Sequence, residues 1–275
     1  MKLLVGDIGN TVTKISLFET NKYKSIKNFY FDSIKILSNK YLDKNLKIDN
    51  KKKNINKYAL FSSVVPKYKI KLSNYLIKKY NIKLIEIKDK RIKKNILINI
   101  KNKKQIGSDR IANAISVYNK YKFNCIVVDF GTATTFDVVT KKGFYNGGVI
   151  APGVNLSINN LVNSADLIPF FKLKMQKQII GKNTLEALRS GFYWGYSGLI
   201  KNIIERIEKE TNTKYKIIFT GGYANFFQKS LSRSVTVDKN ITINGIIEIF
   251  KKNRKYLTKW KKKNLFFARW EVQER

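Results

Sequence analysis

The sequence contains no histidine and only one cysteine among its 275 residues. The absence of histidine excludes catalytic triads that depend on an imidazole base, and metal sites with imidazole ligands. A single cysteine excludes an intramolecular disulfide and a zinc cluster of several cysteines. That residue, Cys125, begins a run of isoleucine and valine, so we expect a buried apolar side chain. Acid–base chemistry must therefore come from Asp, Glu, Lys or Tyr.

Long apolar runs are also missing, since no stretch approaches the roughly 20 uncharged apolar residues of a membrane-spanning helix. Asp7 interrupts the first apolar run before a secretory signal could form. We therefore expect a cytoplasmic protein that has no membrane association. The chain is long enough for one large domain or two modest ones, each burying its own core.

Acidic residues are scarce, with 19 Asp and Glu against 55 Lys and Arg, and the formal net charge is +36. Such a charge can indicate a polyanionic partner. In this chain lysine is spread almost throughout, together with asparagine and isoleucine, whereas strong nucleic-acid binders usually concentrate charge on one face. We interpret most of the charge as a solvated surface, and expect association with nucleic acid to be weak, nonspecific and salt-sensitive.

Hydrophobic and β-branched patterns divide the chain into two α/β halves. Strands are predicted at Lys2–Ile8, Lys14–Glu19 and Tyr23–Phe31, and the Lys- and Asn-rich stretch Ser38–Lys57 is expected to be a surface connection. Later strands are predicted at YALFSSVVP, KLIEI, NCIVVDFG, TTFDVVT and KIIFT, and helices at KYKIKLSNYLIKKY, IANAISVYNKY, NTLEALRSGFYWGYSGLIKNIIERIEKE and ITINGIIEIFKK. We place an N-terminal domain at residues 1–118, a C-terminal domain at 119–250 and a basic C-terminal extension at 251–275, which could be disordered or helical.

One strand–turn–strand phrase occurs twice, as LLVGDIGNTVTKISLF and as IVVDFGTATTFDVV, with Asp7 aligned to Asp129. In each copy an apolar strand ends in an aspartate, and a glycine-containing turn with hydroxyl or amide side chains follows. Glycine lets a backbone approach a phosphate, N–H groups and threonine hydroxyls donate to its oxygens, and the aspartate can hold a cation. A single copy would be read as an ordinary hairpin turn. Two copies, one per domain, indicate a clamp for the phosphates of a nucleotide.

Neither a P-loop motif nor a Gly-x-Gly-x-x-Gly after a strand occurs, so those two kinds of nucleotide site are not expected. The paired hairpins, with the later glycine turn FTGGYA that could receive adenosine, resemble the actin-like, sugar-kinase and heat-shock ATPase superfamily. Within it, the motifs DIGNT, GSDRIAN, DFGTATTFDVV, GGVIAPG and GKNTLEALRSG resemble type III pantothenate kinase in order and separation. The resemblance covers about residues 2–250.

This resemblance implies an α/β fold of two ribonuclease-H-like domains, each a mixed five-stranded sheet flanked by helices. It implies a homodimer that phosphorylates pantothenate with ATP to 4'-phosphopantothenate, the first step toward coenzyme A. Asp7 would organise Mg²⁺, and Asp129 would bind a monovalent cation such as K⁺ or NH₄⁺. The implied ATP-binding residues are Asp7, Ile8, Gly9, Asn10, Thr11, Val12, Thr13, Lys14 and Thr132. The implied pantothenate-binding residues are Gly107, Ser108, Asp109, Arg110 and Thr184.

Asp109 is the candidate catalytic residue. Phosphoryl transfer to an alcohol needs a carboxylate that accepts the hydroxyl proton, and a chain without histidine offers few rivals. The alternative is structural, because GSDR precedes a helix and would place Ser108 near its N-cap and Asp109 in its first turn. Arg110 could offer a donor fork to an anionic or polar substrate group, or form a surface salt bridge. Thr184 could equally be a helix N-cap.

The loop before GSDR departs from the family pattern, which usually has an aromatic residue and an Asn-Pro pair there. This chain has Ile98 and Asn102-Lys103 instead. Without the proline we expect a looser loop and weaker substrate affinity, with activity retained. The alternatives to a pantothenate kinase are a kinase for another small alcohol and a nonenzymatic transcriptional accessory protein. The glycine-containing helix LEALRSGFYWGYSGLIKNIIERI could be a dimer element or an ordinary core helix.

Overall fold

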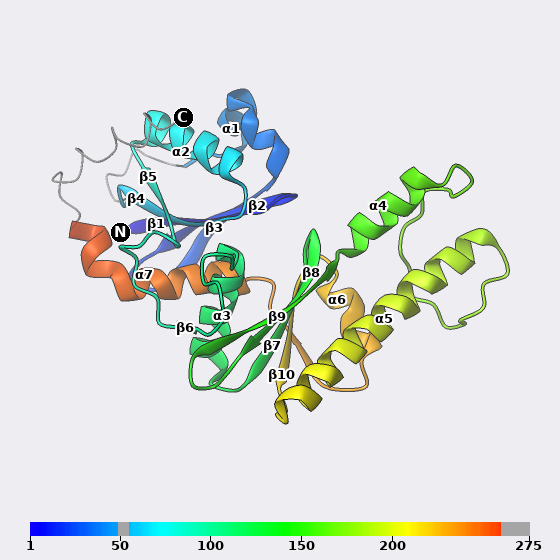
Figure 1. Cartoon of the computed structure of the whole chain (residues 1–275). Coiled ribbons are helices and arrows are strands. Elements are labelled where there is room, and N and C mark those ends of the chain that lie inside the picture. The colour runs from blue at the N-terminus through cyan, green and yellow to red at the C-terminus, as the bar shows by residue number, and fades with distance from the viewer. Residues whose placement is uncertain (49–54, 260–275) are drawn as a thin grey trace.

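The computed structural model describes residues 1–48 and 55–259 and contains two mixed β-sheets, each flanked by helices (Figure 1). The first sheet has the order β3-β2-β1-β4-β5, in which two antiparallel hairpins are continued by the parallel strands β4 and β5. This sheet and the helices beside it comprise β1 Lys2–Ile8, β2 Val12–Glu19, β3 Lys24–Asp32, the 3-10 helix η1 Ser33–Leu37, α1 Asn39–Asn45, β4 Tyr58–Ser63, α2 Pro66–Tyr80 and β5 Lys83–Glu86.

The second sheet repeats this arrangement with the order β11-β10-β7-β8-β9-β6. Again an antiparallel meander is continued by parallel strands, here β10 and β11. Its elements are β6 Leu97–Ile98, β7 Cys125–Phe130, β8 Ala133–Val139, β9 Phe144–Pro152, α4 Val154–Ser164, α5 Thr184–Thr211, β10 Lys216–Gly221, α6 Ala224–Phe227, the 3-10 helix η2 Gln228–Ser230 and β11 Val235–Val237. The expected α/β fold with two mixed sheets flanked by helices is therefore confirmed.

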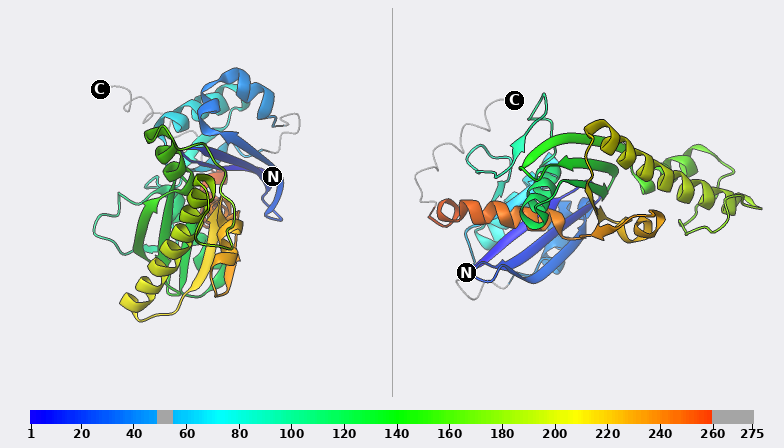
Figure 2. Two further views of the ribbon diagram at one scale, coloured as in Figure 1. Left: turned by 90° about the vertical axis from the view of Figure 1, so that its right-hand side faces the viewer. Right: turned by 90° about the horizontal axis from the view of Figure 1, so that it is seen from below.

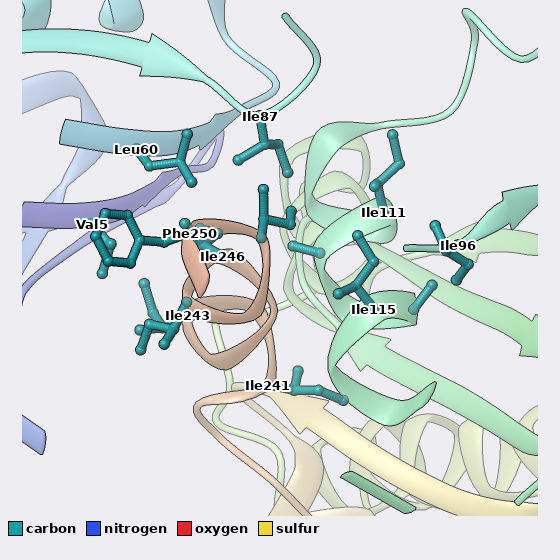
Figure 3. Close-up of a cluster of buried hydrophobic side chains, with 14 of the residues drawn as sticks. Val5, Leu60, Ile87, Ile96, Ile111, Ile115, Ile241, Ile243, Ile246 and Phe250 are labelled. Atoms are coloured by element: carbon teal, nitrogen blue, oxygen red, sulfur yellow. The ribbon is translucent and has the colours of Figure 1, made fainter. Parts of the chain in front are cut away.

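Two helices, α3 (Ser108–Tyr121) and α7 (Ile241–Lys259), lie between the two sheets. Figure 3 shows α7 with its apolar side chains between the first sheet and α3. Phe250 of α7 is fully buried in the same cluster as Val5 and Leu60 of the first sheet and Ile111 and Ile115 of α3. Burial of this apolar surface holds the two halves of the chain in one arrangement.

Each half of the chain contributes one segment to the other half, across the boundary predicted near residue 118. Leu97 and Ile98 precede that boundary, yet as β6 they pair in parallel with Phe144 and Tyr145 of β9 and give the second sheet a sixth strand. In the other direction, α7 comes from the second half of the chain and packs on β1 and β4 of the first sheet. The expected count of five strands is correct only for the first sheet, because a two-residue strand carries too short a pattern to be read from sequence.

The stretch Ser38–Lys57 is not a simple surface connection. It contains α1, and Leu42, Leu46 and Ile48 are buried in the core of the first sheet. Residues 49–54 lie outside the described residues. Apolar residues spaced by about one helical turn among the lysines explain the burial.

The predicted basic extension begins inside α7, which continues to Lys259. Asn253 and Leu257 are buried, and the Asn253 side chain bonds both backbone groups of Lys93. The remainder of the extension, residues 260–275, is outside the described part of the chain. Among the helices in the described ranges, none is both long and apolar enough to cross a membrane.

Replacement of Gly245 in α7 tests the packing of the two central helices. A Cβ atom on Gly245 would lie 1.9 Å from the carbonyl oxygen of Ala112 in α3, so the helices must separate to admit it. We expect Gly245→Ala to lower the free energy of unfolding by about 2 kcal/mol or more, although alanine favours a helix. Urea unfolding would measure the loss. Gly222→Ala is the matched control, because its Cβ would meet nothing nearer than 3.9 Å and should change stability by less than about 1 kcal/mol.

Candidate active site

The two repeated turns occupy equivalent places in the two sheets. Asp7 is the next-to-last residue of β1, and Asp129 is the next-to-last residue of β7. Each is followed by a tight turn that begins at a glycine, where the N–H of Gly9 donates to the Val12 carbonyl and that of Gly131 to the Ala133 carbonyl, both at 3.1 Å. The sequence repeat is therefore a structural repeat as well.

The two turns face each other across the junction of the sheets. The hydroxyl oxygens of Thr11 and Thr132, one from each turn, are 3.0 Å apart. Beside them the Lys14 ammonium donates to the Lys239 carbonyl at 3.3 Å, just before α7. Two glycine-containing turns with threonine hydroxyls and a lysine thus converge from opposite halves of the chain, as a clamp for phosphate groups requires.

Glycines from two further motifs close around the second turn. A Cβ on Gly153, at the end of GGVIAPG, would lie 2.2 Å from the carbonyl oxygen of Thr132. Gly221 of FTGGYA has a φ of +85°, and its Cβ would lie 2.5 Å from the carbonyl oxygen of Phe130. The N–H of Gly222 donates to that same carbonyl at 3.0 Å. At the positions of Gly153 and Gly221 only glycine allows the two backbones to come so close. Both motifs therefore shape the second turn.

Three carboxylates, those of Asp7, Asp109 and Asp129, share this junction. Burial, the Asp109 carboxylate and the Asp129 carboxylate, in that order, raise the pKa of Asp7 to about 7. Burial and Asp109 also raise the pKa of Asp129 to about 6. Hydrogen bonds oppose these shifts, from Ser62 to Asp7 and from the Asn113 amide to Asp129 at 3.1 Å. The three groups are therefore close enough to disfavour one another's ionisation, which marks a functional site.

Asp109 lies in the first turn of α3, and burial raises its pKa. One carboxylate oxygen accepts the backbone N–H of Arg110 at 2.8 Å and stands over Gly107, where a Cβ would lie only 2.4 Å from it. The carboxylate has no side-chain ion pair among the described residues. It is a partly buried carboxylate next to the junction of the two turns.

Ser108 lies next to the N-cap of α3, as expected, whereas the N-cap of α5 stands one residue before the expected Thr184. Gly107 caps α3, while the buried Ser108 hydroxyl accepts the N–H of Ser63 in β4 and donates to the Ser63 carbonyl, both at 2.8 Å. In α5 the cap is Asn183, whose side chain accepts the N–H of Glu186. Sequence alone could not separate adjacent polar residues at a helix start. The bonds of Ser108 instead anchor α3 to the first sheet.

Thr184, the other predicted substrate residue, is exposed and begins α5. Figure 1 and the right-hand view of Figure 2 show that α4, the segment after it and the N-terminal end of α5 extend away from both sheets. The structure therefore brings together Asp7–Lys14, Asp109, Asp129 and Thr132, but leaves Thr184 apart from them within one chain.

Arg110 is not a surface salt bridge. Its Nε donates to Asp137 at 2.7 Å, and the two side chains are 16% and 0% exposed. The Tyr145 hydroxyl donates to the same Asp137 oxygen at 2.8 Å. Sequence reasoning missed Asp137 and Tyr145, although an aspartate inside the apolar strand TTFDVV was a signal. It also missed Asn113, which stands one helical turn after Asp109.

The loop before GSDR is held by a residue that the sequence did not single out. The Lys88 ammonium donates to the carbonyls of Lys104 and Ile106, both at 2.9 Å. Asn102 accepts the N–H of Lys104 through its side chain at 3.1 Å. These bonds fix the loop without a proline.

Carboxylate and hydroxyl oxygens are the donors that Mg²⁺ and K⁺ prefer, and Asp7 and Asp129 supply the carboxylates here. In the described residues no group of three or more Asp, Glu or Cys side chains could hold a metal by itself. The carboxylates of Asp7 and Asp129 fit Mg²⁺, because this ion is commonly bound through one or two carboxylates together with substrate phosphates and water.

This chain is similar to known proteins in sequence and in fold. The family model described as Type III pantothenate kinase matches residues 3–206. The type III pantothenate kinase of Pelagibacter ubique is 48% identical over 250 residues, which cover 89% of this chain and 97% of that protein. That of Desulforapulum autotrophicum is 33% identical over 252 residues, with coverage of 89% and 94%. A Campylobacter jejuni structure described as a Baf family transcriptional activator has a TM-score of 0.60 over 92% of this chain and all of its own; at 22% identity it shows the fold alone.

Two facing aspartate-tipped hairpins in two linked α/β domains define a member of the actin-like ATPase and sugar-kinase superfamily. Within that class, the family match and the similarity to curated relatives over most of both chains are decisive. The chain belongs to the type III pantothenate kinase family.

The raised pKa of Asp7 predicts a stability that depends on pH. With a pKa near 7 in the folded state and about 3.9 in the unfolded state, Asp7 binds more proton when folded, so its ionisation destabilises the fold as pH rises through this window. We expect Asp7→Asn to be more stable than the wild type by about 1–2 kcal/mol at pH 8, with the difference vanishing near pH 4. Thermal unfolding without nucleotide or Mg²⁺ measures it. The exposed Glu210→Gln should show no such trend; a less stable Asp7→Asn at pH 8 would contradict the burial.

Proposed function

We propose that this protein transfers the γ-phosphoryl group of ATP to the 4'-hydroxyl of pantothenate, the first step toward coenzyme A. Membership of the family supports this reaction. The main structural support in this chain is that the turns at Asp7 and Asp129 converge beside Asp109. A phosphoryl group held between the turns would lie next to a partly buried carboxylate. This is the arrangement that in-line transfer to an alcohol needs.

In this proposal the first turn, residues 7–14, and Thr132 bind the phosphates of ATP. Their N–H groups, hydroxyls and the Lys14 ammonium donate to the phosphate oxygens. Asp7 would organise Mg²⁺, and Asp129 would hold a monovalent cation such as K⁺ or NH₄⁺. When bound, these cations offset the negative charge of the transferring group and of the carboxylates themselves.

Asp109 acts as the base. Its carboxylate accepts a hydrogen bond from the 4'-hydroxyl of pantothenate and takes its proton as the phosphoryl group moves. The raised pKa of Asp109 makes it a better proton acceptor than an exposed aspartate. Gly107, Ser108 and Arg110 would line the pantothenate pocket, with Ser108 fixing the start of α3 on β4.

The Ile98 and Lys103 departures leave the loop beside this pocket without an aromatic contact. We keep the expectation of a weaker pantothenate affinity with activity retained. The bonds from Lys88 support retained activity, because they hold the loop backbone in place. A kinase that consumes ATP is expected to act in the cytoplasm.

Replacement of Asp109 tests the reaction. We expect Asp109→Asn to lower kcat by at least about 100-fold, because the amide cannot accept the proton. A coupled assay for ADP release, with and without pantothenate, measures this, and a panel of other small alcohols tests the substrate. Glu210→Gln, an exposed carboxylate on α5, should leave the rate unchanged. Full activity of Asp109→Asn, or a rate of ADP release that does not depend on pantothenate, would overturn the proposal.

The protein is further proposed to be a homodimer through α5. One face of this helix carries Gly191, Gly195 and Gly198, and a Cβ on any of the three would meet no atom within 4 Å. They line a groove with Ile179 and Ile180, which are 68% and 70% exposed. Small residues beside exposed apolar side chains permit close approach of a second helix. In a dimer, the partner subunit's Thr184 could reach the substrate site that Thr184 of the same chain does not.

The oligomeric state can be tested at the centre of this groove. Wild-type protein is expected to sediment at twice the 32.0 kDa of one chain, and Gly195→Arg at the mass of one chain, because the new side chain blocks the approach. Glu210→Arg places the same side chain at the exposed C-terminal end of α5, with an even larger change of charge, and should remain a dimer. A monomeric wild type, or a dimeric Gly195→Arg, would refute this interface.

A further inference from the structure

Arg110 has two carboxylates within reach, and only one of them binds its guanidinium group. The carboxylate of Asp109, its neighbour in the chain, accepts the backbone N–H of Arg110 instead. The guanidinium turns to Asp137 in β8, whose Oδ1 accepts from Nε at 2.7 Å. The substrate-side motif is therefore tied to the interior of the second sheet.

Tyr145 completes this unit from β9. Its hydroxyl donates to Asp137 Oδ1 at 2.8 Å, and the centre of its ring is 5.8 Å from the guanidinium carbon of Arg110. Burial and the Asp137 carboxylate raise the pKa of Tyr145, so the hydroxyl stays protonated and remains a donor. Gly148 lies opposite Asp137 in the register of β8 and β9, and a Cβ there would come within 2.9 Å of Arg110 Nη2. The guanidinium thus lies among a carboxylate, an aromatic ring and a backbone segment, while the Arg110 side chain remains 16% exposed.

The pairing is incomplete in a way that a purely structural ion pair would not be. Arginine and aspartate in contact usually form two parallel hydrogen bonds. Here Arg110 Nη2 and Asp137 Oδ2 are both buried and without a partner in the described residues, and a single bond joins the side chains. Buried unsatisfied polar atoms are costly, and in native proteins they often mark functional sites.

We propose that Asp137 and Tyr145 are positioning residues for the substrate, which hold the Arg110 guanidinium away from the Asp109 carboxylate and orient it toward the negatively charged end of pantothenate. This inference rests on the proposed function. It has two chemical consequences. The base is left free of an ion pair that would lower its basicity, and a planar donor group is fixed in the motif that lines the substrate pocket.

The inference predicts a change in substrate discrimination that a loss of stability would not produce. Pantothenate carries a carboxylate, and its primary amide is neutral but nearly identical in shape. Wild-type enzyme should prefer pantothenate to the amide in kcat/KM. In Asp137→Asn we expect this preference to fall at least tenfold, through a higher KM for pantothenate with the KM for ATP unchanged. Tyr145→Phe, which removes one bond to Asp137, should give a smaller fall of the same kind.

Controls separate positioning from folding. Val138→Ala removes buried volume from the same strand but from the opposite face of the sheet, in a different core cluster from Tyr145, so it should lower stability while leaving the discrimination ratio unchanged. Arg110→Lys should lose the discrimination, and adding Asp137→Asn to it should cause no further loss, because the residue being positioned is gone. If Asp137→Asn does not fold, Tyr145→Phe carries the test.

The outcomes distinguish the two levels of the argument. An active wild type whose preference survives in Asp137→Asn and in Tyr145→Phe would overturn the positioning inference alone. Equal losses toward pantothenate and its amide would also overturn it, because they indicate a structural effect. A wild type that transfers no phosphoryl group to pantothenate would refute the proposed function, and this inference with it.

Discussion

The packing of α7 against α3 is the constraint on which the rest of the structure depends. These helices come from different halves of the chain, and Gly245 lets their backbones approach until side chains have no room between them. Because α7 also packs on β1 and β4, the pair fixes one sheet relative to the other (Figure 1). The turns at the ends of β1 and β7 then meet with two hydroxyl oxygens 3.0 Å apart. Because the site is made of turns from two distant parts of the chain, it depends on this helix packing to hold them together.

The electrostatics of the site follow from this closure. Placing Asp7, Asp109 and Asp129 in one partly buried region raises their pKa values, and their ionisation therefore weakens the fold. Stability is commonly lower where function demands unfavourable proximity. Arg110 could neutralise this cluster, yet its bond to Asp137 holds it elsewhere. The chain therefore keeps its carboxylates available for ligands.

Much of this could be predicted from sequence. The strands at the repeated hairpins follow from β-branched runs, and the repeat itself placed Asp7 and Asp129 correctly at two equivalent turns. What could not be predicted depends on contacts between residues far apart in the chain. Neither the pairing of β6 with β9 nor the bond from Arg110 to Asp137 has a local pattern. The cap of α5 was misplaced by one residue for a different reason, since Asn183 and Thr184 offer similar local chemistry at a helix start.

The most direct test of the account asks whether the two turns close on the same nucleotide. Thr11→Cys combined with Thr132→Cys places two thiols where the hydroxyls are 3.0 Å apart, and the native Cys125 is buried and should not interfere. The account predicts that these cysteines form a disulfide readily under mild oxidation, and that a nonhydrolysable ATP analogue with Mg²⁺ slows its formation. Failure to form the disulfide, or a rate that ignores the nucleotide, would contradict a shared phosphate clamp.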